Sequence, residues 1–308
     1  MSHPYLLHPR RALVAAVLCL GVAATATAQT PAPAPAKPAT PAKSAQKPAP
    51  KPGPNDFKLV LEPKAMALLK AVSDRLAAAK SLSFTAIVGY EYPSKLGPPI
   101  VYTSRYDVSL QRPDKLRILM PGDGPASEFY YDGKTMMAYA PKENLVAVAP
   151  APPTVDAALI EAFTKAGMYF PFTDLLAADP YKALTEGGVL AFYVGPSGNV
   201  GGVPTDMVVW ASNDVFMQIW IGTADQLPRR VRAIFRNDPL ALRHEMELTN
   251  WQLDPALPAE TFASAKAQAA PRMEFKAPGL PPGAKPITLK KAAQPAAKAA
   301  PKAPAASN

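Results

Sequence analysis

The chain has 308 residues, 33 of them basic and 24 acidic, which gives a formal net charge of +9. Twelve of the basic residues lie in residues 1–54 and 276–308, and these two segments contain no acidic residue. Residues 55–275 therefore hold 21 basic and 24 acidic residues, so the positive charge belongs to the two ends of the chain. A basic chain usually suggests nucleic-acid binding, but this distribution and the export signal described next exclude that class of partner.

Residues 1–28 have the pattern of a cleavable signal peptide. Arg10 and Arg11 precede an apolar run at 12–24, and Ala26-Thr27-Ala28 supplies a small-x-small cleavage pattern. The run is too short for a membrane-spanning helix, which needs about 20 apolar residues. We expect cleavage after Ala28, and a mature chain that works outside the cytoplasm without a transmembrane segment.

The mature chain has a sparse inventory of reactive side chains. The single cysteine, Cys19, lies inside the signal segment, and Leu18 precedes it where a lipoprotein signal has a small residue. Disulfides, thiol chemistry and lipidation are therefore excluded. His244 is the one histidine left after cleavage, so metal sites built on several histidines are excluded as well. We expect no metal and no cofactor.

Two segments flank the central part of the chain. Residues 29–54 form a predicted linker and residues 276–308 a predicted tail, both composed mostly of Pro, Ala and Lys, and such segments are typically disordered. They are either passive spacers or weak binders of anionic envelope surfaces. The intervening residues 55–275 have the size of one domain.

The first half of this domain is predicted to be a helix followed by strands. Pro63 suits a first helical position, and apolar residues recur at helical spacing until the period changes near Lys80. From Ser83 the period becomes two, which predicts a meander of about six strands ending at Ala149.

The second half repeats this order with shorter helices. Thr154 is a favourable N-cap for a helix that stops at Gly167, a short turn of helix follows at 173–176, and Asp179-Pro180 begins another that ends at Gly187. Alternating residues then predict five strands, at 189–194, 205–211, 215–221, 229–236 and 244–251.

This order predicts an α+β fold. Ten or eleven antiparallel strands rarely stay flat, so we expect a single large curved sheet, an unclosed β-barrel, with helices covering its open face.

Two motifs that could carry chemistry have simpler explanations. The glycines between Gly195 and Gly202 join strand to strand, with Pro204 where a phosphate-binding helix would start, so we expect a hairpin loop. Glu245 and Glu247 share one strand face and would be the carboxylate pair of a hydrolase, but such spacing is common on solvated strands. We assign no catalytic residue and expect the protein not to be an enzyme.

Aromatic and apolar residues are spread over many of the predicted strands. They either fill an ordinary core or line an apolar cavity within the curved sheet, as in barrels whose lumen is not filled by side chains. The sequence leaves both open. The candidates for the cavity or core are Phe84, Val88, Tyr102, Tyr106, Leu116, Met137, Trp210 and Trp220.

Several dispersed motifs resemble a bacterial family of predicted periplasmic proteins, domain of unknown function 2092. The resemblance covers roughly residues 60–275 and implies the periplasm as the compartment. Here Thr205 and Asp206 follow Val203-Pro204, where related members often carry Cys or His, so a thiol or metal role there is absent. The motifs are Arg75–Phe84, Gln111–Leu116, Phe129–Thr135, Asp179–Tyr181, Gln218–Ile221 and Pro228–Arg230.

More distantly, the same pattern is similar to the LolA/LolB-like periplasmic lipoprotein carriers. This resemblance implies helices that act as a lid over an apolar cavity in an unclosed barrel. In the carriers the arginine of an Arg-Pro turn helps to hold the lid, and the matching residue here is Arg112. A strand-end arginine in a salt bridge is the alternative.

The sequence therefore suggests a non-enzymatic periplasmic protein that binds or carries a hydrophobic ligand, such as an acyl chain, a lipid or a lipoprotein. A protein-interaction or scaffold module of the envelope, without a ligand cavity, is the alternative. A carboxylate-based hydrolase is a third hypothesis.

Overall fold

The computed structural model describes residues 59–122 and 124–277. The predicted signal peptide, the predicted linker, all of the predicted tail except residues 276 and 277, and Asp123 lie outside the described residues. Within the described part, no helix is both long and apolar enough to cross a membrane.

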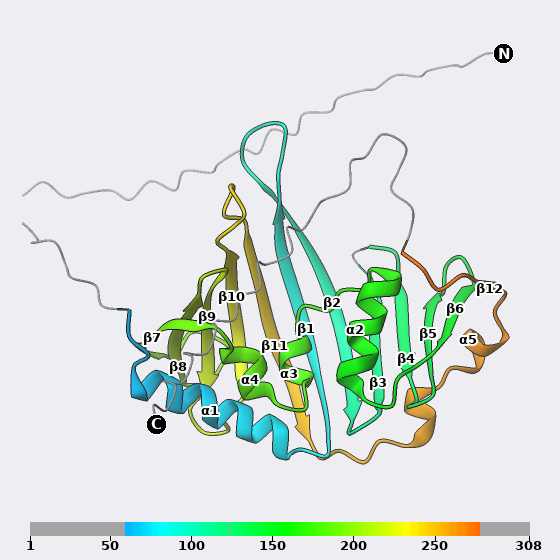
Figure 1. The fold of residues 1–308 in the computed structure, drawn as a ribbon, viewed down its shortest axis with the longest axis horizontal. Coiled ribbons are helices and arrows are strands. Elements are labelled where there is room, and N and C mark those ends of the chain that lie inside the picture. The colour runs from blue at the N-terminus through cyan, green and yellow to red at the C-terminus, as the bar shows by residue number, and fades with distance from the viewer. Residues whose placement is uncertain (1–58, 123, 278–308) are drawn as a thin grey trace, which may run out of the picture. The chain divides into compact units, whose positions relative to one another are not determined.

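The described strands form one large sheet, with two antiparallel meanders joined at its centre (Figure 1). The sheet order is β12-β6-β5-β4-β3-β2-β1-β11-β10-β9-β8-β7, and β1 pairs with β11 where the meanders meet. The first meander comprises β1 (Ser81–Tyr92), β2 (Ile100–Gln111), β3 (Lys115–Met120), β4 (Ser127–Tyr131), β5 (Thr135–Ala140) and β6 (Leu145–Pro150). The second comprises β7 (Gly188–Ser197), β8 (Thr205–Ser212), β9 (Val215–Gly222), β10 (Pro228–Phe235) and β11 (Arg243–Leu253).

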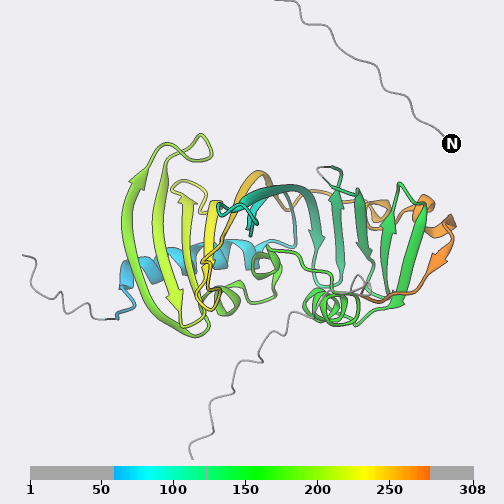
Figure 2. The same ribbon diagram turned by 90° about the horizontal axis from the view of Figure 1, so that it is seen from above.

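The helices cover one face of this sheet, which we call the inner face. Seen from above, the strands follow a curve, with β7–β10 in one half and β3–β6 in the other (Figure 2). The predicted α+β class, with a large unclosed and mostly antiparallel sheet, is therefore confirmed. The covering helices are α1 (Pro63–Ala78), α2 (Val155–Ala166), α3 (Thr173–Leu176) and α4 (Pro180–Thr185).

Local sequence signals place the ends of these helices. Pro63 occupies the first turn of α1, and the Thr154 side chain accepts a hydrogen bond from the backbone N–H of Ala157 at the start of α2. Gly167 ends α2 in the left-handed conformation, φ 66°, which glycine adopts without strain. Asp179 caps α4 by accepting a bond from the N–H of Lys182. The predicted caps are confirmed.

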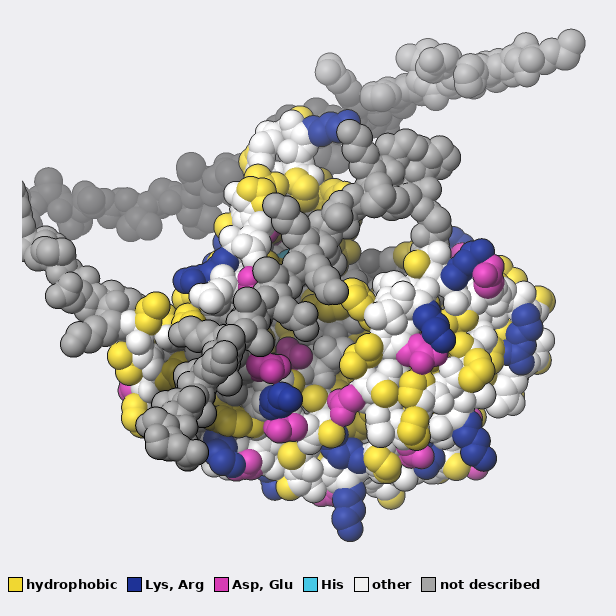
Figure 3. All heavy atoms as spheres, in the orientation of Figure 1, with side chains coloured by type: hydrophobic (Ala, Val, Ile, Leu, Met, Phe, Trp, Pro, Cys, Tyr) yellow, Lys and Arg dark blue, Asp and Glu magenta, His cyan; other side chains and the backbone are white. Residues whose placement is uncertain are grey.

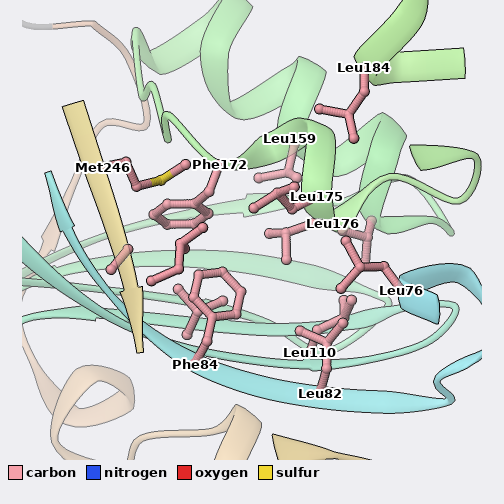
Figure 4. Packing of buried hydrophobic residues seen from close by; sticks show 14 of the residues in the cluster. Leu76, Leu82, Phe84, Leu110, Leu159, Phe172, Leu175, Leu176, Leu184 and Met246 are labelled. Carbon is pink, nitrogen blue, oxygen red and sulfur yellow. The ribbon is translucent and has the colours of Figure 1, made fainter. Parts of the chain in front are cut away.

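The centre of the inner face is filled by α3 and the residue before it. The Phe172 ring meets the Phe84 ring edge to face, with centroids 5.5 Å apart, and lies beside Leu175 and Leu176 (Figure 4). The stripe Ala65, Leu69, Val72 and Leu76 of α1 is fully buried in the same cluster. The middle of the sheet is therefore a packed core rather than an open lumen.

The sequence analysis missed the C-terminal part of the fold. A 3₁₀ turn at Ala259–Phe262, helix α5 (Ala265–Ala269) and strand β12 (Arg272–Met273) follow β11. Ala267 and Ala270 pack with Tyr130, Met137 and Val146 in a second cluster on the outer face of β4–β6. Strand β12 then pairs parallel to β6, so it is a twelfth strand beyond the ten or eleven expected.

Both ends of the sheet are closed by short parallel segments. Leu61 bridges Ala191 of β7, with the Ala191 N–H donating to Val60 O and the Glu62 N–H donating to Ala191 O. At the other end, the Val146 N–H of β6 donates to Pro271 O just before β12. Covered edges protect a sheet against pairing with other chains.

Leu248 of β11 provides a test of the core, because its side chain is fully buried where the two meanders meet. We expect Leu248→Ala to lower the free energy of unfolding by roughly 2–5 kcal/mol, from lost burial and a residual cavity. Leu96→Ala is the matched control, since Leu96 is 92% exposed, and should change stability by less than about 0.5 kcal/mol. Urea unfolding followed by far-UV circular dichroism measures both; equal effects would contradict the assigned core.

Candidate functional site

Two apolar cavities lie beside the packed centre, the first within the helix layer and the second between that layer and the sheet. The first, about 360 Å³, is bounded by α2 and α3 and includes Leu159, Ile160 and Phe163. The second, about 390 Å³, lies between the end of α2, strands β2–β6, and β12 with the residues that follow it. Each falls within the range of about 300–1,000 Å³ that is typical of small-molecule sites.

The segment Met168–Tyr169–Phe170 lines both cavities and separates them. It exists because the left-handed Gly167 ends α2 and sends the chain back across the sheet. The Phe170 ring lies 5.4 Å from the Phe129 ring and stacks at 6.2 Å on Phe172, measured between centroids. The wall between the cavities is thus aromatic and is anchored to the core on one side.

The first cavity opens to solvent through apolar side chains. Ile160, Phe163 and Tyr169 are all exposed, and the last two rings meet at 6.4 Å. Hydrophobic side chains lie among charged ones at the surface of the face that carries α2 (Figure 3). Grouped apolar side chains left in water at the mouth of a cavity are typical of ligand or partner sites.

Two carboxylates lie at the rim of the first cavity. Asp156 of α2 accepts hydrogen bonds from the Ala178 N–H at 3.1–3.2 Å, which ties α2 to the chain after α3. Asp174 is exposed, yet desolvation by the surrounding side chains raises its pKa above the ordinary value of 3.8. Desolvation also raises the pKa of the neighbouring Tyr169 hydroxyl. The protonated forms of both groups are therefore favoured at this rim.

Arg112 reaches from the end of β2 to α3. Its Nη1 donates to Leu176 O at 3.0 Å. Its Nε and Nη2 are buried without a hydrogen-bond partner among the described residues. Burial lowers the pKa of this guanidinium, and the charge of Asp156 partly opposes that shift. Arg112 therefore contacts the helix layer, and it forms no salt bridge with another described residue.

The residues proposed from the sequence as cavity or core fall into three groups. Phe84, Val88, Leu116 and Trp210 are buried in the main core. Tyr106 is half-buried and lines the second cavity.

The remaining three lie away from the helix layer. Met137 is buried on the outer face, under α5. Trp220 is half-buried, and the guanidinium of Arg230 lies 5.7 Å from its ring centroid. Tyr102 is 48% exposed on the β1–β2 hairpin. The sequence analysis did not single out Ile160, Tyr169 or Phe170, although an apolar Ile160 outside the stripe of its helix was a usable signal.

The carboxylates that could suggest hydrolysis are engaged in ion pairs on the outer face. Glu245 pairs with Arg230 and with Arg232, and Glu247 lies 3.8 Å from Arg230. His244 is half-buried against Phe235, and burial lowers its pKa. Across the described residues, no three His, Cys, Asp or Glu side chains gather as metal ligands. The Gly195–Gly202 segment joins β7 to β8, as expected of a hairpin loop.

The fold and the cavities describe an open half-barrel with one apolar cavity within its helix layer and a second between that layer and the sheet. A family model described as "Predicted periplasmic protein (DUF2092)" matches residues 65–276, and the chain belongs to this family. The description confirms the periplasm as the expected compartment. No curated protein matches the sequence.

Solved structures with a similar arrangement have low sequence identity to this chain. An uncharacterized conserved protein from Thermus thermophilus is 11% identical, with a TM-score of 0.40, over 68% of this chain and 99% of that one. The lipoprotein LppX of Mycobacterium tuberculosis is 12% identical, with a TM-score of 0.40, over 64% and 98%. A LolA superfamily protein from Nitrosomonas europaea is 10% identical, with a TM-score of 0.33, over 65% and 97%.

Asp174 gives the site a predicted pH dependence. Because its pKa is raised in the folded state, the folded protein binds more protons than the unfolded chain between the two pKa values, and stability falls as pH rises through that window. We expect Asp174→Asn to raise the melting temperature at pH 7 and to have no such effect at pH 3. Asp156→Asn, which weakens a hydrogen bond, should lower it at pH 7. Calorimetry measures the melting temperature of each variant at both pH values. An equal shift for Asp174→Asn at pH 3 and pH 7 would contradict the raised pKa of Asp174.

Proposed function

We propose that this protein binds and carries an apolar ligand, an acyl chain of a lipid or of a lipoprotein, in the two adjoining cavities, without chemical conversion. The observation that carries the proposal is the aromatic segment Met168–Phe170 with a cavity on each side. A ligand that entered at the exposed mouth would exchange water for aromatic and aliphatic side chains on both walls.

The energetic reason is the cost of exposing an acyl chain in the periplasm. Each methylene in water costs about 0.8 kcal/mol, so a chain of about 16 carbons costs on the order of 10 kcal/mol. A protein that moves such a chain between membranes has to cover most of it. The apolar surface left open at Ile160, Phe163 and Tyr169 is surface that such a ligand would bury.

The helix layer would act as the adjustable part of the site. Segment α3 is four residues long, and with the preceding Phe172 it fills the centre of the inner face through Leu175 and Leu176. Displacing it would join the cavities to the space that these side chains occupy. In this proposal Arg112 is the residue that holds the layer closed, through its bond to Leu176 O.

A second candidate function is a scaffold module of the envelope that binds a protein partner. The packed centre around Phe84 and Phe172 favours it, because a filled core needs no ligand. The two candidates differ in what should copurify with the protein: lipid in the first case, and a protein in the second.

Phe163→Asp tests the ligand site, because Phe163 lines the first cavity and is 47% exposed. We expect at least about tenfold weaker binding of palmitate and of a fluorescent naphthylamine probe, since one phenylalanine side chain contributes roughly 1.5–3 kcal/mol of burial. Phe235→Asp is the matched control, 39% exposed on β10 outside both cavities, and should bind like wild type.

Native mass spectrometry of protein purified from the periplasm, with lipid extraction, identifies the natural ligand class. Acyl lipid in the wild type and its loss in Phe163→Asp support the proposal. A wild-type protein that carries no lipid and binds neither palmitate nor the probe would rule it out.

Arg112→Met tests the holding role. Loss of a hydrogen bond from a charged donor, worth roughly 1.5–3 kcal/mol, should speed amide exchange in α3 at least about tenfold. The N–H groups of Leu175 and Ala177, which bond to Phe172 O and Thr173 O, are the reporters, read by hydrogen exchange with mass spectrometry. Arg117→Met, whose native side chain bonds to Ser109, is the control and should leave α3 exchange unchanged. Equal exchange in both variants would contradict the role.

A further inference from the structure

Strand β2 has a strand partner on one side only along residues 100–106. On that side β1 pairs with its whole length, up to Ile100 opposite Tyr92. On the other side, pairing with β3 begins at Asp107 opposite Leu119. No other described strand takes up this stretch, and the hairpin stands clear of β3 (Figure 1). An uncovered strand edge is a template for pairing with another chain.

The backbone groups on this free edge can be assigned. The Arg112 N–H donates to Lys80 O of the β1 side. Because the groups of successive residues in an antiparallel strand point alternately to the two neighbours, the even-numbered residues of β2 face β1. The N–H and C=O groups of Val101, Thr103 and Arg105 therefore point to the open side.

This open edge contrasts with the two ends of the sheet. The β7 edge is covered by Val60–Glu62, and the β6 edge by β12. The free stretch of β2 has neither cover nor an internal proline, and Arg105 is its single charged residue. Ile100, Val101 and Tyr102 within it are exposed. Apolar side chains and unpaired backbone groups thus coincide on one stretch of strand.

We propose that this edge pairs with the same edge of a second copy of the chain, forming a two-fold symmetric homodimer. With Thr103 opposite Thr103 of the second copy, Val101 faces Arg105 of the second copy on each side of the axis. Each of these pairs exchanges two backbone hydrogen bonds, so every outward group of the three residues is satisfied. A two-fold contact of this kind closes on itself and does not propagate into a fibre.

The side chains fit the same register. On the inner face Ile100 lies opposite Tyr106, and Tyr102 opposite Ser104, which places aromatic, β-branched and hydroxyl groups together. Like charges do not meet, because Arg105 faces Val101 and is held by Asp107 at 3.0–3.2 Å. Since Tyr106 lines the second cavity, Ile100 of the second copy would sit beside that cavity.

The pairing between the two copies also ends before it would collide with β3. The residue opposite Asp107 would be Pro99 of the second copy, at the point where β3 already pairs with β2. Proline has no N–H to donate and terminates a ladder. Pro99 therefore turns the second chain away before it would meet Leu119.

Opposite charges introduced at Thr103 test the dimer, because this exposed residue faces itself across the axis. Thr103→Glu and Thr103→Lys each place like charges directly opposite, and we expect each variant alone to dimerise at least about tenfold more weakly than wild type. An equimolar mixture of the two should regain a dimer that weakens with salt. Sedimentation velocity on the mature chain measures the mass of each sample.

Thr249→Glu and Thr249→Lys are the matched controls, on an exposed threonine of β11 opposite Thr85 in the sheet interior. They should dimerise like wild type. Melting curves of all four variants check that each is folded. A wild-type chain that stays monomeric at about 1 mM, where a dimer with a Kd near that value is detectable, overturns the proposal. So does a dimer that is indifferent to charge at Thr103, or a mixture that stays monomeric.

Discussion

The inner face of the sheet carries the main cluster of buried apolar side chains and has to be covered by helices that are mostly short. Helix α1 has 16 residues and α2 has 12, but α3 and α4 have four and six. At the centre, Phe172 and the two leucines of α3 are buried in the core. Beside α2, a return segment with no regular structure does the covering, and the cavities lie on its two sides. The site thus arises because the helices cover the middle of the inner face but leave it incompletely covered toward β3–β6.

Much of the fold could be predicted because its signals are local. Caps at Thr154 and Asp179, a stop at Gly167 and the switch from helical to alternating periodicity each act within a few residues. The candidate site was harder to predict from the sequence. Alternation tells which side chains share a face of a strand, but not which face the helices cover, and so Met137 was grouped with Phe84 although they lie on opposite faces. Alternation also does not show where the neighbouring strands end. The exposed Tyr102 and the buried Val108 therefore have the same sequence pattern.

The elements that were missed share a different cause. The segment Met168–Phe170 has no period, so its role depends wholly on the tertiary position that Gly167 and α3 give it. The C-terminal elements are rich in alanine and contribute few large apolar side chains. Their burial arises because Ala267 and Ala270 approach a patch around Tyr130 closely, where small side chains fit. Neither feature leaves a pattern along the chain.

The short segments that close the ends of the sheet bear on where this domain begins and ends. The family match starts at residue 65, but the chain bonded to β7 is Val60–Glu62. At the other end, Ala277 donates its N–H to Lys165 O at the end of α2, one residue beyond the match. A shortened protein cut at the limits of the family match would keep every long strand, but it would lose the first two residues of α1, uncover β7 and free the last turn of α2. The smallest autonomous unit is therefore set by hydrogen bonds made outside the region that sequence similarity recognises.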